Sequence, residues 1–169
     1  IISVRITTSM INKRLEAIQE ADIELLVQNS VAEGKNLEYK EVLPDNSDNA
    51  KKEFLADVSS FANTAGGDLI FGIKEEKGIP TAVVGLEVED IDKELARLES
   101  LIITGLKPRI QHFIAHFRLK NGKILVIIRV RQSWIKPQRV IFRGHDKFYG
   151  RNSIGKYPLD VEELRAAFN

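Results

Sequence analysis

The sequence predicts a single α+β domain in which helices flank a mixed β-sheet. Residues 54–62 carry apolar side chains at the spacing of one helical face. A glycine turn at 65–67 leads into the apolar run 68–73, whose β-branched and aromatic residues are typical of an interior strand. Asn121-Gly122 joins two alternating segments, which is a strong hairpin signal. The 169 residues provide for one domain with a sizeable core, and no linker divides them.

The chain begins with an arm and two short helices. Residues 1–9 alternate weakly and are expected to form an edge strand or an arm, and Ser9 is expected to cap a helix over 11–18. A second helix is expected over 22–27. Residues 37–42 alternate with period 2 and predict a half-buried strand.

The middle of the chain predicts two longer helices separated by a hairpin. The first helix runs from about 50 to 64, after a polar loop. The strands 68–74 and 82–85 follow it, with 77–78 near the tip of their turn. The second helix covers 89–103, where apolar residues again recur on one side.

The last part of the chain predicts several strands and a final helix. The two segments around 121–122 form an antiparallel pair. Short strands are expected at 139–142 and 147–151, linked by a turn at 144–146. A capping box at 160–163 begins the last helix.

The composition excludes several kinds of chemistry. The chain has no cysteine, so disulfides, thiolate zinc sites and cysteine nucleophiles are excluded. No apolar run approaches the ~18 residues of a membrane span. No signal-peptide pattern is visible at the start. We therefore expect a cytoplasmic protein without a membrane partner.

The net charge of +1 conceals a strong asymmetry. Residues 1–106 hold 11 Lys and Arg against 20 Asp and Glu, a net of −9. Residues 107–156 hold 13 Lys and Arg and one acid, Asp146, a net of +12. This span predicts a positive surface that meets phosphates. Alternatively, the charges are spread over both faces of a sheet. The residues expected to contact phosphate are Lys40, Arg129, Arg131, Lys136, Arg139, Arg143, Lys147 and Arg151.

Aromatic residues are interspersed with these cations. Trp134, Phe148 and Tyr149 lie among them in the sequence. An aromatic ring beside arginine suits stacking on an unpaired base. Core packing is the alternative for each ring taken singly.

Four motifs stand out along the chain. They are E-G-K-N-L-E-Y-K-E at 33–41, F-A-N-T-A-G-G-D-L-I-F-G-I at 61–73, V-V-G-L at 83–86 and F-Y-G-R-N-S at 148–153. Together they resemble the Schlafen AlbA-like domain family. The resemblance implies an AlbA-like, nucleic-acid-binding domain over 31–169, preceded by the arm and helices of 1–30. Bacterial members of this family are described as DNA-binding, ATP-binding or transcriptional-regulator proteins.

The resemblance also implies a candidate metal site. In nuclease members, two glutamates in an E-x-x-x-x-E pattern and one Asp after the glycine-ended strand form a carboxylate triad that binds divalent metal and cleaves RNA. Glu33 and Glu38 match this spacing and are candidate metal ligands, but Lys74 stands where the Asp is expected. The nearest acids are Glu75 and Glu76, which complete the candidate catalytic set. Carboxylates are ligands that Mg²⁺ or Mn²⁺ prefers. The competing interpretation is that these acids pair with lysines on an exposed edge.

The basic span favours a domain that contacts the phosphates of DNA or RNA, and the resemblance implies that this domain belongs to a bacterial transcriptional regulator. The resemblance implies a homodimer, because nuclease Schlafens build a basic groove from two copies of this unit. One alternative is a metal-dependent endoribonuclease, and another is an ATP- or nucleotide-binding module. The turn at 63–67 is the candidate phosphate cradle for the latter, although the C-terminal end of a helix disfavours anions. The chain has no G-x-x-x-x-G-K-[ST] loop.

Overall fold

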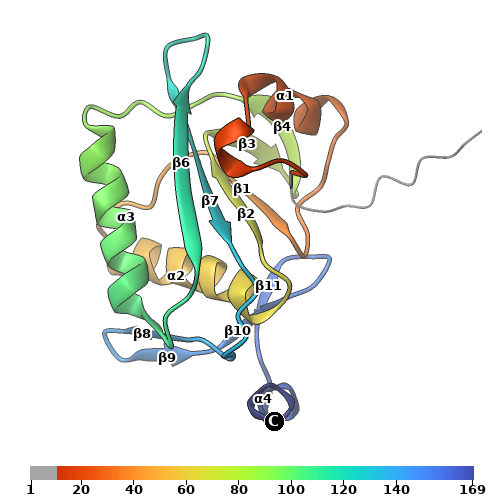
Figure 1. Ribbon diagram of the computed structural model, residues 1–169, viewed down its shortest axis with the longest axis vertical. Helices are drawn as coiled ribbons and strands as arrows, with labels where there is room; N and C mark the ends of the chain where they lie inside the picture. Colours follow the sequence, from red (N-terminus) through yellow and green to blue (C-terminus); the bar gives the residue numbers. More distant parts are fainter. Residues whose placement is uncertain (1–10) are drawn as a thin grey trace, which may run out of the picture.

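The computed structural model describes residues 11–169, so the strand or arm predicted over 1–9, with the predicted helix cap Ser9, lies outside the described residues. The central feature is a four-stranded sheet with the strand order β1-β2-β7-β6 (Figure 1). Its strands are β1 (Leu37–Lys40), β2 (Gly67–Phe71), β7 (Ile124–Val130) and β6 (His112–Arg118). β1 and β2 run parallel and the other neighbours antiparallel, which confirms the predicted mixed sheet. The parallel pair is possible because α2 (Asp48–Asn63) connects its strands as a crossover.

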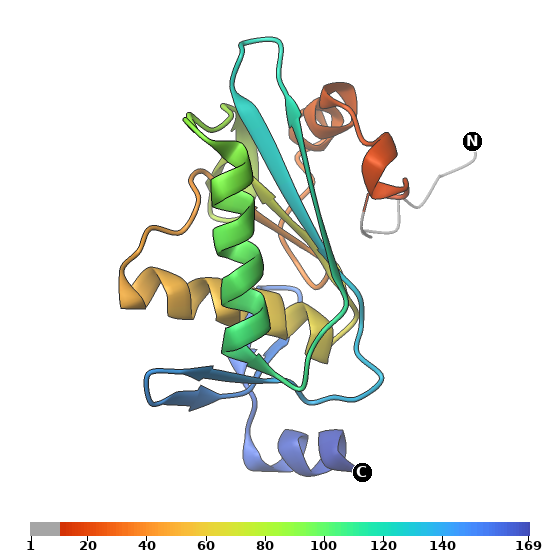
Figure 2. The same cartoon turned by 60° about the vertical axis from the view of Figure 1, so that its left-hand side comes forward.

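Two helices cover one face of this sheet. α2 and α3 (Ile91–Gly105) pack there, and Figure 2 shows them on the side opposite the N-terminal elements. Side chains such as Phe54 and Leu98 join residues of β2 and β7 in the larger core cluster. Both helices are confirmed, although each differs at its ends from the predicted 50–64 and 89–103.

A smaller core cluster lies on the other face of the sheet, under the N-terminal elements. These elements are the single turn η1 (Leu15–Ala17) and the helix α1 (Glu20–Gln28). The helix predicted over 11–18 is wrong except for that turn. Arg129 of β7 accounts for the difference, because its guanidinium binds the main-chain carbonyls of Ile11 and Lys13. Those carbonyls accept from Arg129 rather than from helical N–H groups.

The strand predicted over 37–42 is confirmed over residues 37–40 as β1, but β1 is enclosed on both faces rather than half-buried. Leu37 and Tyr39 belong to the smaller cluster. Glu38, which points the opposite way, is only 8% exposed. The strand therefore places a carboxylate in the interior of the domain.

Two hairpins confirm the turn predictions. β3 (Ile73–Glu76) and β4 (Ile79–Val83) are joined by Lys77 and Gly78, whose φ angles are 50° and 79°. Two successive positive φ angles make the turn that matches the twist of a hairpin. β6 and β7 are joined through Gly122, with a φ of 85°.

The C-terminal strands form two small sheets below the central one. β8 (Arg139–Phe142) and β9 (His145–Lys147) form one sheet with β5 (Leu106–Lys107), which follows α3 in the chain. β10 (Tyr149–Arg151) and β11 (Lys156–Pro158) form the other. The single strand predicted over 147–151 is wrong, because the chain passes from one sheet to the other at Phe148. The turn before it is also earlier than predicted. Arg143 and Gly144 both have positive φ, 43° and 75°, and close the β8–β9 hairpin.

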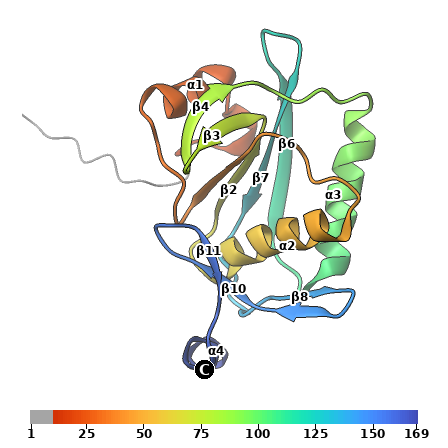
Figure 3. The ribbon, with the colours of Figure 1, turned by 180° about the vertical axis from the view of Figure 1, so that it is seen from behind.

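The last helix, α4 (Val161–Phe168), begins with the predicted capping box. The side chain of Asp160 accepts from the Glu163 N–H at 2.9 Å, and the side chain of Glu163 accepts from the Asp160 N–H at 3.0 Å. α4 buries no residue and lies beyond β10 at one end of the molecule (Figure 3). No helix within residues 11–169 is long and apolar enough to cross a membrane.

Candidate functional site

Five charged residues from four elements form a buried ionic network: Glu38, Lys40, Asp57, Arg151 and Lys156. Arg151 donates to the Glu38 carboxylate at 2.6 Å, and Lys40 Nζ lies 3.1 Å from the same carboxylate. Lys40 and Lys156 then flank Asp57 of α2, at 3.3 and 2.7 Å. The network fastens the β10–β11 hairpin to β1 and α2.

The ionic network favours the charged forms of Glu38 and Lys156, whereas burial and the charge of Glu38 raise the pKa of Asp57 above its ordinary value. Burial by itself would raise the pKa of Glu38, but the charges of Arg151 and Lys40 outweigh it and hold that pKa below its ordinary value. Burial would likewise lower the pKa of Lys156, yet Asp57 raises it above the ordinary value. Glu38 and Lys156 are therefore ionised at neutral pH.

Two of the predicted phosphate contacts belong to this network. The Arg151 side chain is 0% exposed, and its guanidinium lies 4.2 Å from the centre of the Phe61 ring. It is too deeply buried to reach a phosphate, so that prediction is wrong. Lys40 is partly exposed but is already paired with two carboxylates. The sequence carried a signal for the network in Asp57, which shares an apolar helical face with Phe54 and Phe61.

Arg129 is also held inside the fold. Its guanidinium forms two hydrogen bonds, of 2.7 and 2.9 Å, to the carboxylate of Asp68, which is 0% exposed. The same side chain binds the carbonyls of the N-terminal segment and is itself 15% exposed. Arg129 therefore stabilises the fold and is not available as a phosphate contact.

Glu33 and Glu75 meet at the tip of the β3–β4 hairpin. Glu33 Oε1 accepts from the Tyr39 N–H at 2.9 Å, and Glu75 Oε2 accepts from the Gly78 N–H at 2.6 Å. Burial, with the nearby charges of Glu38 and Glu75, raises the pKa of Glu33 to about 7. These carboxylates hold backbone groups, and Glu33 is partly protonated at neutral pH.

The residues present do not fit the carboxylate triad that the resemblance implies. Among residues 11–169, no three His, Asp or Glu side chains gather closely enough to hold a metal ion. Glu38 is saturated by Arg151 and Lys40, and Glu76 is exposed on the opposite side of β3 from Glu75. Catalysis by these glutamates, with Mg²⁺ or Mn²⁺, stays a prediction.

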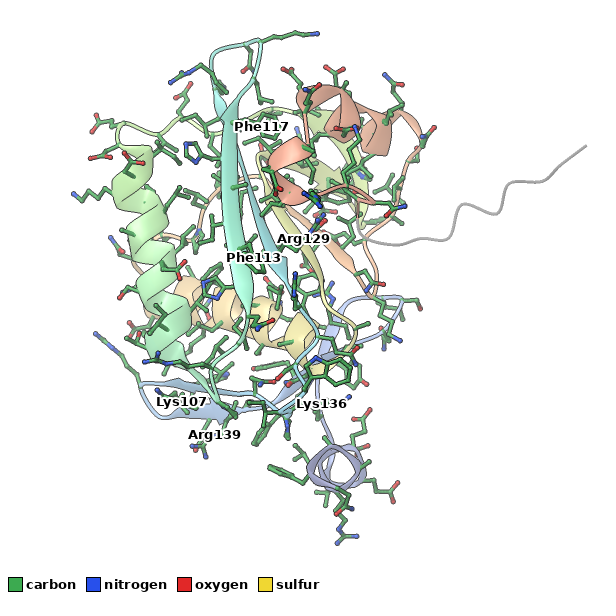
Figure 4. All side chains as sticks on the ribbon, viewed as in Figure 1. Lys107, Phe113, Phe117, Arg129, Lys136 and Arg139 are labelled. Atoms are coloured by element: carbon green, nitrogen blue, oxygen red, sulfur yellow. The ribbon has the colours of Figure 1, made fainter. Side chains whose placement is uncertain are left out.

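Six exposed cations of the basic span 107–156 gather at one end of the molecule, which we call the basic end. Its members are Lys107, Arg109, Arg131, Lys136, Arg139 and Lys147, all exposed. Lys107 faces Arg139 across the β5–β8 pair, and Figure 4 shows both with Lys136 at the lower end of the view. Arg139 also pairs with Asp146 at 2.8 Å. Two members, Lys107 and Arg109, were missed, although they belong to the basic span 107–156.

Arg143 lies apart from the basic end, at the tip of the β8–β9 hairpin. It is paired with Asp48 at 3.0 Å, and both side chains are exposed. An exposed pair of this kind is weak, so Arg143 is available to a ligand at small cost.

The loop 133–138 carries the most exposed aromatic residue in the described part of the chain. Trp134 is 101% exposed and Ile135 is 71% exposed. Phe148 instead packs edge-on against Phe168, 5.9 Å between ring centres. Tyr149 is half-buried against the larger core cluster. Of the three aromatic residues predicted to stack on a base, only Trp134 presents its ring to a ligand.

The turn at 63–67 is occupied by structural contacts. The N–H groups of Thr64 and Gly66 both donate to the carbonyl of Phe61, at 3.2 and 2.8 Å. Gly66 has a φ of 72°, and a Cβ there would lie 2.8 Å from the Val130 carbonyl oxygen. Phosphate binding at this turn, and with it the nucleotide alternative, stays a prediction.

A family model described as "Schlafen, AlbA_2" matches residues 33–160. No curated protein matches the chain. Among solved structures, the DIP2311 protein of Corynebacterium diphtheriae is similar, with a TM-score of 0.55, 23% identity and coverage of 88% of this chain. The chain spans 28% of the length of that protein. A second similar structure is the N-terminal domain of a Nitrosomonas europaea protein that is named as related to the ATP-dependent DNA helicase RecG. Its TM-score is 0.50 and its identity is 25%, and the match covers 72% of this chain and 79% of that domain. These likenesses support the α+β fold described above.

Proposed function

Since the chain belongs to the Schlafen AlbA_2 family, we propose that it binds nucleic acid by holding phosphates at the basic end. The observation that carries this proposal is a set of exposed cations on adjoining elements. Within residues 11–169, no carboxylate forms an ion pair with Lys107, Arg109, Arg131, Lys136 or Lys147. Unneutralised cations attract the phosphate backbone and release its counterions on binding.

Further support comes from the similar structures. Both belong to bacterial proteins, and one is named for its relation to a DNA helicase. The finer part of our proposal is that the domain serves a bacterial transcriptional regulator and acts as a homodimer. Two copies would double the number of phosphates that the basic ends contact.

The test compares two double variants with equal loss of charge. Lys107→Ala/Lys136→Ala removes two cations from the basic end, and Lys93→Ala/Lys120→Ala removes two exposed cations elsewhere. Binding of labelled single-stranded and duplex DNA and RNA of about 20 residues is followed by fluorescence anisotropy between roughly 50 and 300 mM salt. We expect wild-type affinity to fall steeply with salt, and the slope of log K against log salt to decrease by about 2 in the first variant.

The control double variant should keep the wild-type slope. Equal losses in both variants would mean that only net charge matters, which contradicts a site at the basic end. Absence of binding to every nucleic acid would reject the proposed function.

A further inference from the structure

We propose that the loop 133–138 selects single-stranded nucleic acid by stacking an unpaired base on Trp134. This inference rests on the proposed function and adds the class of nucleic acid and the residue that recognises it. It is carried by the way the loop is anchored, by what its tip exposes and by the charges around it.

The base of the loop is fastened to the C-terminal end of α2. The Ser133 N–H donates to the Ala62 carbonyl at 2.8 Å. Asn63 donates to the Gln138 carbonyl at 2.9 Å and accepts from its N–H at 2.6 Å. The Gln138 side chain donates to Ser133 Oγ at 2.7 Å and to the Ile135 carbonyl at 3.0 Å. Gln138 is 0% exposed and its side-chain bonds are part-buried, so these bonds anchor the base of the loop.

The tip of this anchored loop presents a bare indole ring. Trp134 is 101% exposed, so its ring contributes nothing to the core of the described structure. Ile135 beside it is also exposed. A large apolar surface that an anchored loop keeps in water indicates a binding partner. The anchored backbone fixes the point from which the indole extends, and the side chain has only two χ angles to order when a planar ligand stacks on it.

The surroundings favour a nucleobase over an apolar protein surface. Arg131 precedes the tip, Lys136 follows Trp134 within the loop, and Arg139 begins the next strand. Contacts on both its main chain and its side chain position Arg131. The guanidinium lies 5.3 Å from the centre of the Phe113 ring, and the main-chain N–H donates to the Gln111 carbonyl. An aromatic platform with cations on both sides is the arrangement by which proteins bind single strands without reading sequence.

A duplex would use only part of this surface. In a double helix each base is already stacked on its neighbours, so no base face is available to an indole. The duplex can still meet the cations through its phosphates. We therefore expect the cations to contact the phosphates of both single strands and duplexes, and Trp134 to stack only on bases of the single strand.

Trp134 is the only tryptophan of the chain, so its fluorescence reports stacking directly. A dT oligonucleotide of about 12 residues should quench the emission, and a duplex of equal length should bind without quenching. Trp134→Ala should weaken binding of the single strand by about 5- to 150-fold, the range expected for loss of one stacked base. Trp134→Tyr should retain most of the affinity. The fully exposed position means that neither variant should change the melting temperature.

The outcomes separate this inference from the function it rests on. Selective loss of single-strand binding in Trp134→Ala, with duplex binding intact, supports both. Unchanged single-strand affinity in Trp134→Ala, or equal quenching by duplex, overturns the stacking inference and leaves phosphate binding in place. Quenching by anionic phospholipid vesicles but not by dT also overturns it, in favour of a membrane surface. If neither strand form binds, both the inference and the proposed function fail.

Discussion

Arg151 holds the C-terminal part of the chain against the central sheet. Its guanidinium reaches the Glu38 carboxylate of β1, the carbonyl of Gly34 and the ring of Phe61. The pair is buried, so neither charge can be hydrated if its partner is removed. A buried pair of this kind is therefore costly to break from one side, whatever its net contribution to stability.

We predict that Arg151→Ala lowers the free energy of unfolding by about 3–5 kcal/mol, because it leaves Glu38 as an uncompensated buried charge. Denaturation in urea measures this change. Arg143→Ala is the matched control, since it breaks the exposed pair with Asp48, and it should cost about 1 kcal/mol or less. Similar losses in the two variants would show that the buried network is not held by Arg151.

The same pair affects how the nuclease alternative is tested. Glu38→Ala would remove activity by destabilising the domain, whether or not Glu38 acts in catalysis. Glu75→Gln/Glu76→Gln is the cleaner change, because Glu76 is exposed and Glu75 only binds a turn N–H. Mn²⁺-dependent cleavage of RNA by wild type that is lost in this variant would support the alternative.

Glu33 makes the domain less stable as the pH rises. Its pKa is about 7 in the folded state against an ordinary value of 4.5, so the folded state binds this proton more tightly than the unfolded chain does. Its contribution to the free energy of unfolding is full below pH 4.5 and is lost as the pH rises to 7. Because the carboxyl is partly exposed, we expect about 1–2 kcal/mol.

The measurement is urea denaturation of wild type and Glu33→Gln at about pH 4.5 and pH 8. Glu33→Gln cannot ionise, so the loss of stability between the two values should be smaller than in wild type. Glu76→Gln is the control, since Glu76 is exposed, and should behave like wild type. Identical pH dependence in wild type and Glu33→Gln would contradict the prediction.

At the scale of elements, α2 positions both the ionic network and the exposed loop. Asp57 on its buried face pairs with Lys40 and Lys156, and Asn63 at its last turn binds the backbone of Gln138. The C-terminal end of one helix thus sets where the Trp134 loop stands. Substitution of Asn63 should therefore release the loop although the sequence of the loop itself is unchanged.

We predict that Asn63→Ala lowers stability by about 1–3 kcal/mol, because it leaves the buried N–H and C=O of Gln138 without partners. The freed loop should also bind single strands less tightly, while duplex binding stays near wild type. Thermal melting and anisotropy measure the two effects. Asn46→Ala, at an exposed position of the loop before α2, should change neither. If Asn63→Ala is destabilised but keeps the wild-type affinity for single strands, the anchor does not contribute to recognition and this part of the prediction is wrong.

At the scale of the whole molecule, the exposed cations of the basic span divide mainly between two places. Arg118, Lys120 and Lys123 lie in and beside the β6–β7 turn, and the members of the basic end lie at the other end of the molecule (Figure 1). β5 and β8 pair, β9 continues that sheet, and Lys136 lies at the same end (Figure 4). Lys107 and Arg139 are exposed although their neighbours Leu106 and Val140 are buried in the larger core cluster, because successive side chains of a strand point to opposite sides. We therefore expect salt sensitivity of binding to depend on this end rather than on net charge.

Local sequence patterns were sufficient to predict most elements of the fold. The helical spacing of apolar residues predicted α2 and α3, and the turns at Lys77-Gly78 and Asn121-Gly122 predicted two hairpins. Capping and turn chemistry act between residues a few positions apart, so they can be read without knowing the rest of the chain. The α+β class and the mixed sheet followed from the order of these elements.

Only the tertiary structure decided which charges are available to a ligand. Arg129 and Arg131 are two positions apart, yet Arg129 is paired with Asp68, 61 residues away, whereas Arg131 is exposed. Arg151 is likewise paired with Glu38, 113 residues away. The sequence determined that the last third of the chain is basic, but pairing across such separations depends on how the strands are brought together. The fold therefore decided that Arg129 and Arg151 stabilise the interior, and that Trp134 is presented at the surface with cations around it.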